Sequence, residues 1–177
     1  FPASWWLDRS AQNYQDKREV FTAMPYDKLT IVPVSDWIRR EMGRSFLKNY
    51  SFRVIHNGID TEIFKICDGD DVKKKYGWQG KHLLLGVASI WSEEKGLGDF
   101  IKLAQQLRED EVIVLVGVTK EQKNQLPRNM YGIQRTENIE ELARLYSAAD
   151  VFVNPTWQDN YPTVNLEAIA CGTPVVT

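Results

Sequence analysis

The sequence predicts an α/β fold, a Rossmann-like parallel sheet with flanking helices, preceded by the remnant of another domain. The first observation is a change of pattern at residue 81, after which short apolar runs alternate with amphipathic segments. The second is that the runs HLLLGVAS and EVIVLVGV are apolar at consecutive positions. Such runs are typical of strands that are buried on both faces of a parallel sheet, so the alternation indicates βαβ units.

The expected elements follow in chain order. Residues 10–21 favour an exposed helix, 28–35 a strand, 36–46 a helix capped by Ser35, 52–59 a strand and 72–77 a short basic helix. Beyond residue 81 we expect strands at 82–89, 111–118, 130–135, 151–156 and 173–177, and helices at 97–110, 138–150 and 163–171. The chain is therefore divided into residues 1–59, a linker at 60–80, and a Rossmann-like domain at 81–177 that is incomplete at its end.

Composition excludes several classes of function. The 22 basic and 24 acidic residues nearly cancel, so we expect no nucleic-acid partner, and any phosphate site must be local. No apolar run approaches the roughly 20 residues of a membrane span. Cys67 and Cys171 lie far apart, and no Cys/His cluster has metal-ligand spacing, so we predict free thiols and no metal site. The chain begins without a methionine and stops at PVVT, which indicates a fragment of a longer protein.

Polar loops mark the carboxyl ends of the expected strands, where ligands bind in doubly wound sheets. They are SIWSEEKG, GVTKEQ, QRTEN and TWQDNYPT. In the first, Lys95 stands before a glycine and could reach a phosphate oxygen, although its flanking glutamates equally suit a surface residue. Trp91 and Trp157 also fall at strand ends, on the side of the expected cleft.

The last loop and the helix after it form the sharpest pattern. Pro162 or Thr163 should open the helix, and the free amides of a helix start attract phosphate. Asp159 and Glu167 lie eight residues apart around this start, where they could accept hydrogen bonds from sugar or ribose hydroxyls. The alternative is a loop residue and a solvated helix acid that the dipole favours.

Five segments together resemble the C-terminal donor domain of GT-B glycosyltransferases of the retaining family 4 (glycosyl transferases group 1). They are VPVSDWIRREM, VIHNGIDTEIF, KGLGDFIKLA, ENIEELARLYSAADVFVNPT and NYPTVNLEAIACGTPVV, in the family's order and at similar spacing. The resemblance covers residues 29–177. It implies that residues 1–59 end an N-terminal acceptor domain, most of which is missing from this chain.

The resemblance also implies roles for the two acids. The family's E-x7-E signature appears as Asp159-x7-Glu167, with aspartate in place of the first glutamate. Glu167 would bind ribose hydroxyls of the nucleotide, and Asp159 would contact hydroxyls of the donor sugar. The helix start between them, formed by Pro162, Thr163, Val164 and Asn165, would hold the diphosphate.

Basic residues are carried over only in part. Lys95 matches the lysine of the family's phosphate-binding G-R-x-x-x-x-K-G stretch, but Ile90 stands where the family has arginine. Half of the usual cationic clamp on the leaving diphosphate is therefore absent, unless another base such as Arg135 replaces it. Arg135 and Thr136 should line the pocket for the nucleobase.

The expected function is transfer of a sugar from a nucleoside-diphosphate donor to a saccharide or lipid-linked acceptor, with retention of configuration and without a metal or other cofactor. It fits surface polysaccharide or glycoconjugate synthesis by a cytoplasmic enzyme, and leaves room for peripheral association with the inner face of the membrane through the missing domain. This fragment alone should be inactive. The alternatives are a non-catalytic nucleotide-sugar-binding module and a sugar-nucleotide epimerase on the same fold.

Overall fold

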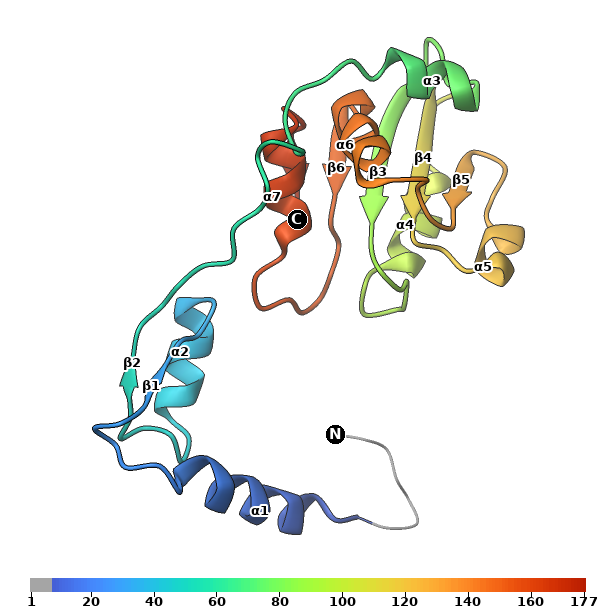
Figure 1. Cartoon of the computed structure of the whole chain (residues 1–177). Coiled ribbons are helices and arrows are strands. Elements are labelled where there is room, and N and C mark those ends of the chain that lie inside the picture. Colours follow the sequence, from blue (N-terminus) through green and yellow to red (C-terminus); the bar gives the residue numbers. More distant parts are fainter. Residues whose placement is uncertain (1–7) are drawn as a thin grey trace. The chain divides into compact units, whose positions relative to one another are not determined.

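The computed structural model describes residues 8–177, which form two compact units that divide between Asn57 and Gly58 (Figure 1). Residues 1–7, where the first predicted domain begins, lie outside the described residues. No helix among residues 8–177 is long and apolar enough to cross a bilayer.

The first unit is small. It contains α1 (Ser10–Thr22), β1 (Thr30–Ile31), α2 (Asp36–Gly43) and β2 (Ser51–Phe52), with the two strands paired in parallel. The Ser35 hydroxyl accepts a bond from the Ile38 amide, so the predicted helix cap is confirmed. The strands are far shorter than expected, because Pro33 has no N–H to donate and so interrupts the hydrogen bonding between them. The pairing continues only as single bonds, such as Ile55 N–H to Pro33 O at 3.1 Å.

The second unit contains the predicted parallel sheet. Its elements are α3 (Asp70–Tyr76), β3 (His82–Val87), α4 (Leu97–Ala104), β4 (Glu111–Val116), α5 (Lys120–Gln125), β5 (Met130–Ile133), α6 (Ile139–Ala148), β6 (Val151–Val153), α7 (Thr163–Ala170) and β7 (Val175–Val176). All pairs are parallel and the order is β5-β4-β3-β6-β7. This is a doubly wound, Rossmann-like sheet.

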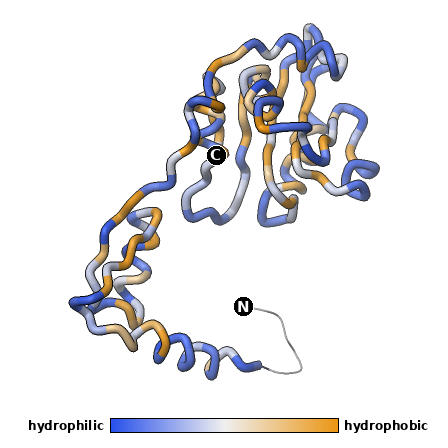
Figure 2. The backbone as a smooth tube through the Cα atoms, in the orientation of Figure 1, coloured by the Kyte–Doolittle hydropathy of each residue, from blue (hydrophilic) through white to orange (hydrophobic). Residues whose placement is uncertain are grey.

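Both faces of this sheet are covered, because alternate residues of a strand point to opposite sides. Leu83 and Leu85 of β3 belong to the core under α3, α6 and α7, whereas Leu84 packs into the second core with Phe100 of α4. In Figure 2 the central strands are correspondingly apolar, and many of the loops at their ends are hydrophilic. The prediction, from continuous apolar runs, of strands buried on both faces is therefore confirmed.

Residues 60–80 differ from the expected linker, because they belong to the second unit. Phe64, Val72 and Trp78 are 6%, 2% and 1% exposed and lie in its core. Gly69, at the start of α3, leaves room for α6, since a Cβ there would come 2.6 Å from the Cα of Ala148. These side chains, with the partly buried Ile63 and Tyr76, pack the stretch against the core of the second unit.

The structure also differs at two helices. The loop GVTKEQ is in fact the entry to α5, where Thr119 and Gln122 form a reciprocal capping box. α4 ends at Ala104 rather than at residue 110. The amides of Gln105 and Gln106 each bond to the carbonyl three residues earlier. Helix boundaries here follow local hydrogen bonding, which apolar periodicity does not report.

Candidate functional site

The carboxyl ends of β3 and β6 lie at the point where the strand order reverses. From β3 the chain proceeds outward to β4 and β5, and then crosses back to β6 and β7 on the other side. The loops that follow β3 and β6 therefore leave in opposite directions and open a crevice between them, where doubly wound folds bind ligands. Lys95 is in the first loop and Asp159 is in the second, so the topology alone brings these two predicted residues to one place.

Lys95 and Asp159 form an ion pair across this crevice. The distance from Lys95 Nζ to Asp159 Oδ2 is 2.9 Å, and the two side chains are 38% and 28% exposed. The other carboxylate oxygen accepts the Tyr161 N–H at 3.1 Å, which fixes the carboxylate at the loop's turn. Two residues that are 64 positions apart in the chain thus form one charged centre.

Backbone contacts hold the two loops together. Glu94 O accepts the Trp157 N–H at 3.0 Å and the Thr156 hydroxyl at 3.4 Å. Gly96 has a φ of 80° and lies so close to Pro155 that a Cβ would come 2.4 Å from the proline ring. Only glycine satisfies both conditions, so the glycine after Lys95 serves loop packing.

The charge state of Asp159 follows from its neighbours. Partial burial would raise the pKa of this carboxyl, but the hydrogen bond and charge of Lys95, together with bonds from the Tyr161 and Asn160 amides, outweigh it. The pKa of Asp159 is therefore lowered, and the group is a carboxylate at neutral pH. A permanent carboxylate can accept hydrogen bonds from sugar hydroxyls, whereas it cannot donate a proton.

The start of α7 lies on the same edge, directly after the Asp159 loop. The helix begins at Thr163 with Pro162 at its N-cap, as predicted. No side chain caps it and its first turn holds no acidic residue, in contrast to α2, α5 and α6. Pro162 has no N–H, so it cannot be one of the donors expected at 162–165.

Asn165, at the same helix start, already has hydrogen-bond partners within the protein. Asn165 N–H already bonds to Pro162 O at 3.2 Å, and its side-chain oxygen accepts from Asn154 at 2.8 Å. The amides of Thr163 and Val164 therefore remain as the donors of this positive helix end. Asn154, at the end of β6, was not singled out from the sequence.

Glu167 lies one turn deeper in α7 and is half-buried. Its Oε2 accepts the hydroxyl of Tyr146 of α6 at 2.9 Å. Burial raises the pKa of this carboxyl, and the Tyr146 bond offsets part of that rise. Tyr146 was missed in the sequence, although a tyrosine among the buried positions of an amphipathic helix needs a partner for its hydroxyl.

The remaining predicted residues lie further along the same edge. Arg135 is exposed and Thr136 is half-buried in the loop after β5, two strands from β3, which is about 10 Å at usual strand spacing. Ile90 is 70% exposed. Trp91 does not face a cleft: it is 5% exposed, packs on Phe100 and donates its indole N–H to Val116 O. Trp157, by contrast, is 63% exposed.

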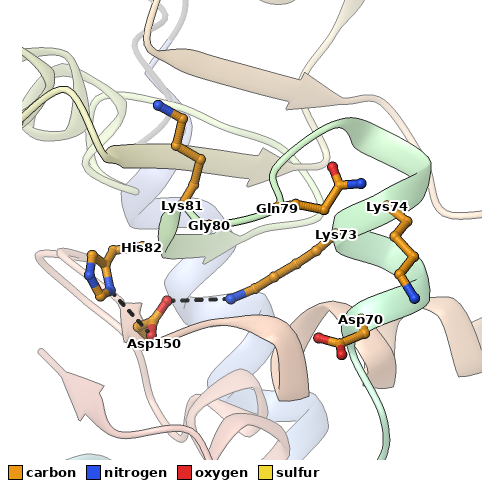
Figure 3. Close-up of a pocket in the computed structure, with 8 residues that line it drawn as sticks. All are labelled: Asp70, Lys73, Lys74, Gln79, Gly80, Lys81, His82 and Asp150. Carbon is orange, nitrogen blue, oxygen red and sulfur yellow. Dashed lines mark ion pairs between the residues drawn. The ribbon is translucent and has the colours of Figure 1, made fainter.

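A separate cavity of about 410 Å³ lies at the opposite edge of the sheet, by the amino end of β3 (Figure 3). It is lined by Asp70, Lys73, Lys74, Gln79, Gly80, Lys81, His82 and Asp150. Lys73 and His82 both point to Asp150, at 3.7 and 3.6 Å. Asp150 also accepts the Leu83 N–H at 2.8 Å, and Lys81 donates to Glu109 O. Three of the four basic side chains in this cavity thus already contact acceptors of the protein itself, so it is a poor receptor for an anion.

The chain is similar in sequence to known proteins. The sequence model of glycosyl transferases group 1 matches residues 81–177, more than half of the chain. The alpha-maltose-1-phosphate synthase of Mycobacterium tuberculosis is 29% identical over 164 residues, which are 82% of this chain and 42% of the relative. The D-inositol 3-phosphate glycosyltransferase 1 of Catenulispora acidiphila is 29% identical over 142 residues, 69% of this chain and 34% of the relative.

Solved structures show the same fold. HepE of Anabaena, in complex with UDP and glucose, superposes with a TM-score of 0.73 at 18% identity, over 94% of this chain and 48% of that one. Sucrose-phosphate synthase from Thermosynechococcus elongatus gives 0.75 at 21% identity, over 98% and 45%. This chain thus spans less than half the length of each of these four proteins. It belongs to the glycosyl transferases group 1 family and contains the Rossmann-like domain of the GT-B fold.

Proposed function

We propose that the complete protein transfers a sugar from a nucleoside-diphosphate donor to a saccharide or lipid-linked acceptor, with retention of configuration. The observation that carries this proposal is the convergence of Lys95, Asp159 and the uncapped start of α7 at the switch point of the sheet. A cation, a permanent carboxylate and free helix amides are the groups that a diphosphate joined to a sugar requires.

In this proposal the chemistry is mainly electrostatic. Negative charge develops on the diphosphate as the bond between it and the sugar breaks, and Lys95 with the Thr163 and Val164 amides stabilises that charge. Lys95 exchanges its bond to Asp159 for one to a phosphate oxygen, and Asp159 then accepts bonds from hydroxyls of the donor sugar. These groups neutralise the leaving group without a metal.

Retention is proposed because both acids of the site among residues 8–177 have other roles in this assignment. Asp159 would contact hydroxyls of the donor sugar, and Glu167, bonded to Tyr146, would hold the ribose. The leaving phosphate oxygen would therefore take the proton of the acceptor hydroxyl, which attacks from the same face. The configuration of the product at the transferred sugar, read by NMR, tests this step directly.

The nucleotide would extend along the carboxyl edge of the sheet. Glu167 would accept bonds from the ribose hydroxyls, and Arg135 with Thr136 would line the pocket of the nucleobase. UDP-glucose is the first donor to try, since HepE of Anabaena was crystallised with it. A bound nucleotide whose base lies away from the loop after β5 would contradict this placement.

The wider assignments stand with the same proposal. Residues 1–59 would end the acceptor domain, and the enzyme would act in the cytoplasm, in surface polysaccharide or glycoconjugate synthesis, with peripheral association at the inner face of a membrane. Fractionation of cells that express the complete protein tests the location. Recovery of the protein in a purely extracellular fraction would contradict it.

One observation favours a second candidate, a module that binds a nucleotide sugar without turning it over. Ile90 leaves Lys95 as the single cation of the phosphate clamp, and Lys95 is itself paired with Asp159. Incubating the complete protein with a panel of nucleotide sugars separates the outcomes. Transfer supports the enzyme, protection against heating without product supports the module, and an epimerised sugar nucleotide would indicate the epimerase.

A further inference from the structure

We propose that Tyr146 is a positioning residue, whose buried hydroxyl orients the Glu167 carboxylate for the nucleotide before the nucleotide binds. This inference rests on the proposed function, in which Glu167 holds the ribose. The hydroxyl of Tyr146 donates to Glu167 Oε2 at 2.9 Å, across the contact between α6 and α7. Tyr146 lies outside the E-x7-E signature, in the segment ENIEELARLYSAADVFVNPT.

The phenol ring of Tyr146 is held so firmly that it can serve as a reference point. It is 0% exposed and meets the rings of Phe64 and Phe152 edge-on, with centroids 6.1 and 5.4 Å away. Its carbonyl oxygen accepts the buried Thr173 hydroxyl at 2.6 Å, which joins the end of α6 to the turn after α7. The hydroxyl therefore stands at a fixed point beside Glu167 of α7.

A fixed donor on one oxygen restricts the whole carboxylate. Glu167 has three rotatable side-chain bonds, and a glutamate without a partner would sample several rotamers. With Oε2 held by Tyr146, Oε1 makes no hydrogen bond within the part of the chain that the structure describes. That oxygen, and the second lone pair of Oε2, are left for a ligand. A preoriented acceptor avoids the entropy cost of ordering the side chain on binding.

The same bond favours the charged form of Glu167. Burial raises the pKa of Glu167, and the Tyr146 hydroxyl is the group that lowers it again. From α6 the titratable neighbour is Tyr146, whose own pKa is raised by burial and by the charge of Glu167. At the end of α7 it is Cys171, whose thiol burial raises to a pKa of about 11. Both neighbours stay neutral near pH 7, so Glu167 is the member of this group that changes charge in the acid range.

The test is a double-mutant cycle on this chain, with UDP, GDP and ADP titrated calorimetrically from about pH 5 to about pH 8. Tyr146→Phe keeps the ring packing and removes only the hydroxyl. We expect it to weaken binding at pH 7 about fivefold to tenfold, since one charge-assisted bond orders the carboxylate. The loss should be larger at lower pH. In a Glu167→Gln background the same change should have no effect on affinity.

A second measurement does not depend on any nucleotide. The side-chain carboxyl carbon of Glu167, followed by NMR against pH, should titrate at higher pH in Tyr146→Phe than in the wild type. Tyr50→Phe is the matched control, because its hydroxyl donates to two carbonyl oxygens, of Phe21 and Met24, in the first unit. It should change neither the affinity nor the titration of Glu167.

The outcomes separate this inference from the proposed function. An unchanged Glu167 titration, or equal loss of affinity in the wild-type and Glu167→Gln backgrounds, would overturn the role of Tyr146 even if nucleotides bind well. A shifted titration in a chain that binds none of the three diphosphates would support the orientation of Glu167 and count against the nucleotide site.

Discussion

The two edges of the sheet in the second unit each contain a lysine–aspartate pair, and the two pairs differ in what surrounds them. At the amino edge, Lys73 and Asp150 are 3.7 Å apart, and Asp150 also contacts His82 and the Leu83 amide. That aspartate joins the beginnings of β3 and β6. At the carboxyl edge, Lys95 and Asp159 are 2.9 Å apart, beside a helix start that no side chain caps.

The difference gives a criterion for separating a candidate functional charge from a structural one in the same fold. At the amino edge Asp150 accepts a hydrogen bond from the Leu83 amide and lies at ion-pair distance from Lys73 and His82 (Figure 3), so its contacts are to the protein itself. At the carboxyl edge Asp159 also contacts a lysine and two loop amides, but the uncapped start of α7 lies beside it. The cavity lies at the amino edge, whereas the amides of the uncapped start of α7 lie at the carboxyl edge. These hydrogen-bond donors favour the carboxyl edge as the candidate ligand site.

Two glutamates of the second unit, the buried Glu141 and the half-buried Glu167, show the same contrast. Glu141 is 3% exposed and accepts from Lys75, the Tyr76 hydroxyl and the Glu137 amide. Burial would raise its pKa, but these bonds outweigh that effect and the pKa is lowered. Glu167 has one donor and a raised pKa. A carboxylate with unused acceptor capacity is the better candidate for a ligand contact.

The largest expected effect comes from Lys95→Ala. It should lower turnover of the complete protein with its donor about 100-fold to 1,000-fold, as expected when one group that stabilises developing charge is removed. Lys73→Ala is the matched control from the other edge and should leave turnover unchanged. Initial rates at saturating donor measure both. Equal losses in the two variants would mean that the contrast between the edges is one of structure alone.

Asp159→Asn should act mainly on turnover. The amide keeps the shape but cannot accept sugar hydroxyls as a carboxylate does, so we expect turnover to fall about 10-fold to 100-fold. Affinity for the free nucleoside diphosphate should hardly change, because that ligand lacks the sugar. Comparing kcat with the calorimetric Kd for the diphosphate checks this split. A loss of diphosphate affinity as large as the loss of turnover would contradict the role of Asp159.

Glu167→Gln should weaken binding of the nucleoside diphosphate by about one to two orders of magnitude, since a neutral amide forms weaker bonds to ribose hydroxyls. Its melting temperature should hardly change, because an acid near a helix start contributes only about 0.3–1 kcal/mol.

Glu141→Gln is its counterpart and should show the reverse. Because Glu141 is buried and accepts from three donors, the free energy of unfolding of this variant should fall by about 1.5–3 kcal/mol. Its affinity for the nucleotide should be retained. Calorimetric titration and thermal denaturation of both variants measure the pair. Loss of stability without loss of affinity in Glu167→Gln would show that this acid is structural.

The sequence predicted the sheet because two-sided burial leaves a direct mark in apolar runs such as HLLLGV. It also predicted the opening of α7 at Pro162 and Thr163, because proline at a helix start has a local cause. What it could not show was distance: the bond from Tyr146 to Glu167 spans 21 positions and the pair of Lys95 with Asp159 spans 64. Such contacts depend on the strand order, which local patterns do not encode.

Errors arose where a local signal was overridden or overlooked. Trp91 was expected at the cleft, but its large apolar ring packs in the core against Phe100. The capping box of Thr119 and Gln122 was visible in the sequence as T-x-x-Q and should have indicated a helix. The segment 60–80 read as a linker by its charge, although Phe64, Val72 and Trp78 carried enough apolar surface to dock it.

The smallest expected effect is a pH dependence of stability in which the two site acids have opposite signs. The pKa of Glu167 is raised from its ordinary 4.5, so the folded state binds more protons than the unfolded state between that value and the raised one. Its contribution to stability is therefore greatest below pH 4.5 and declines as the pH rises through the raised pKa. The pKa of Asp159 is lowered from 3.8, so its contribution is present above that pH and is lost as the pH falls through the lowered value. Melting temperatures of the wild type, Glu167→Gln and Asp159→Asn from about pH 3 to about pH 7 should show the two differences changing in these opposite directions. If the stability difference between wild type and Glu167→Gln instead grew with pH, the Glu167 carboxylate would be stabilised by its surroundings, as Glu141 is, and its place as the unsatisfied acid of the carboxyl edge would be lost.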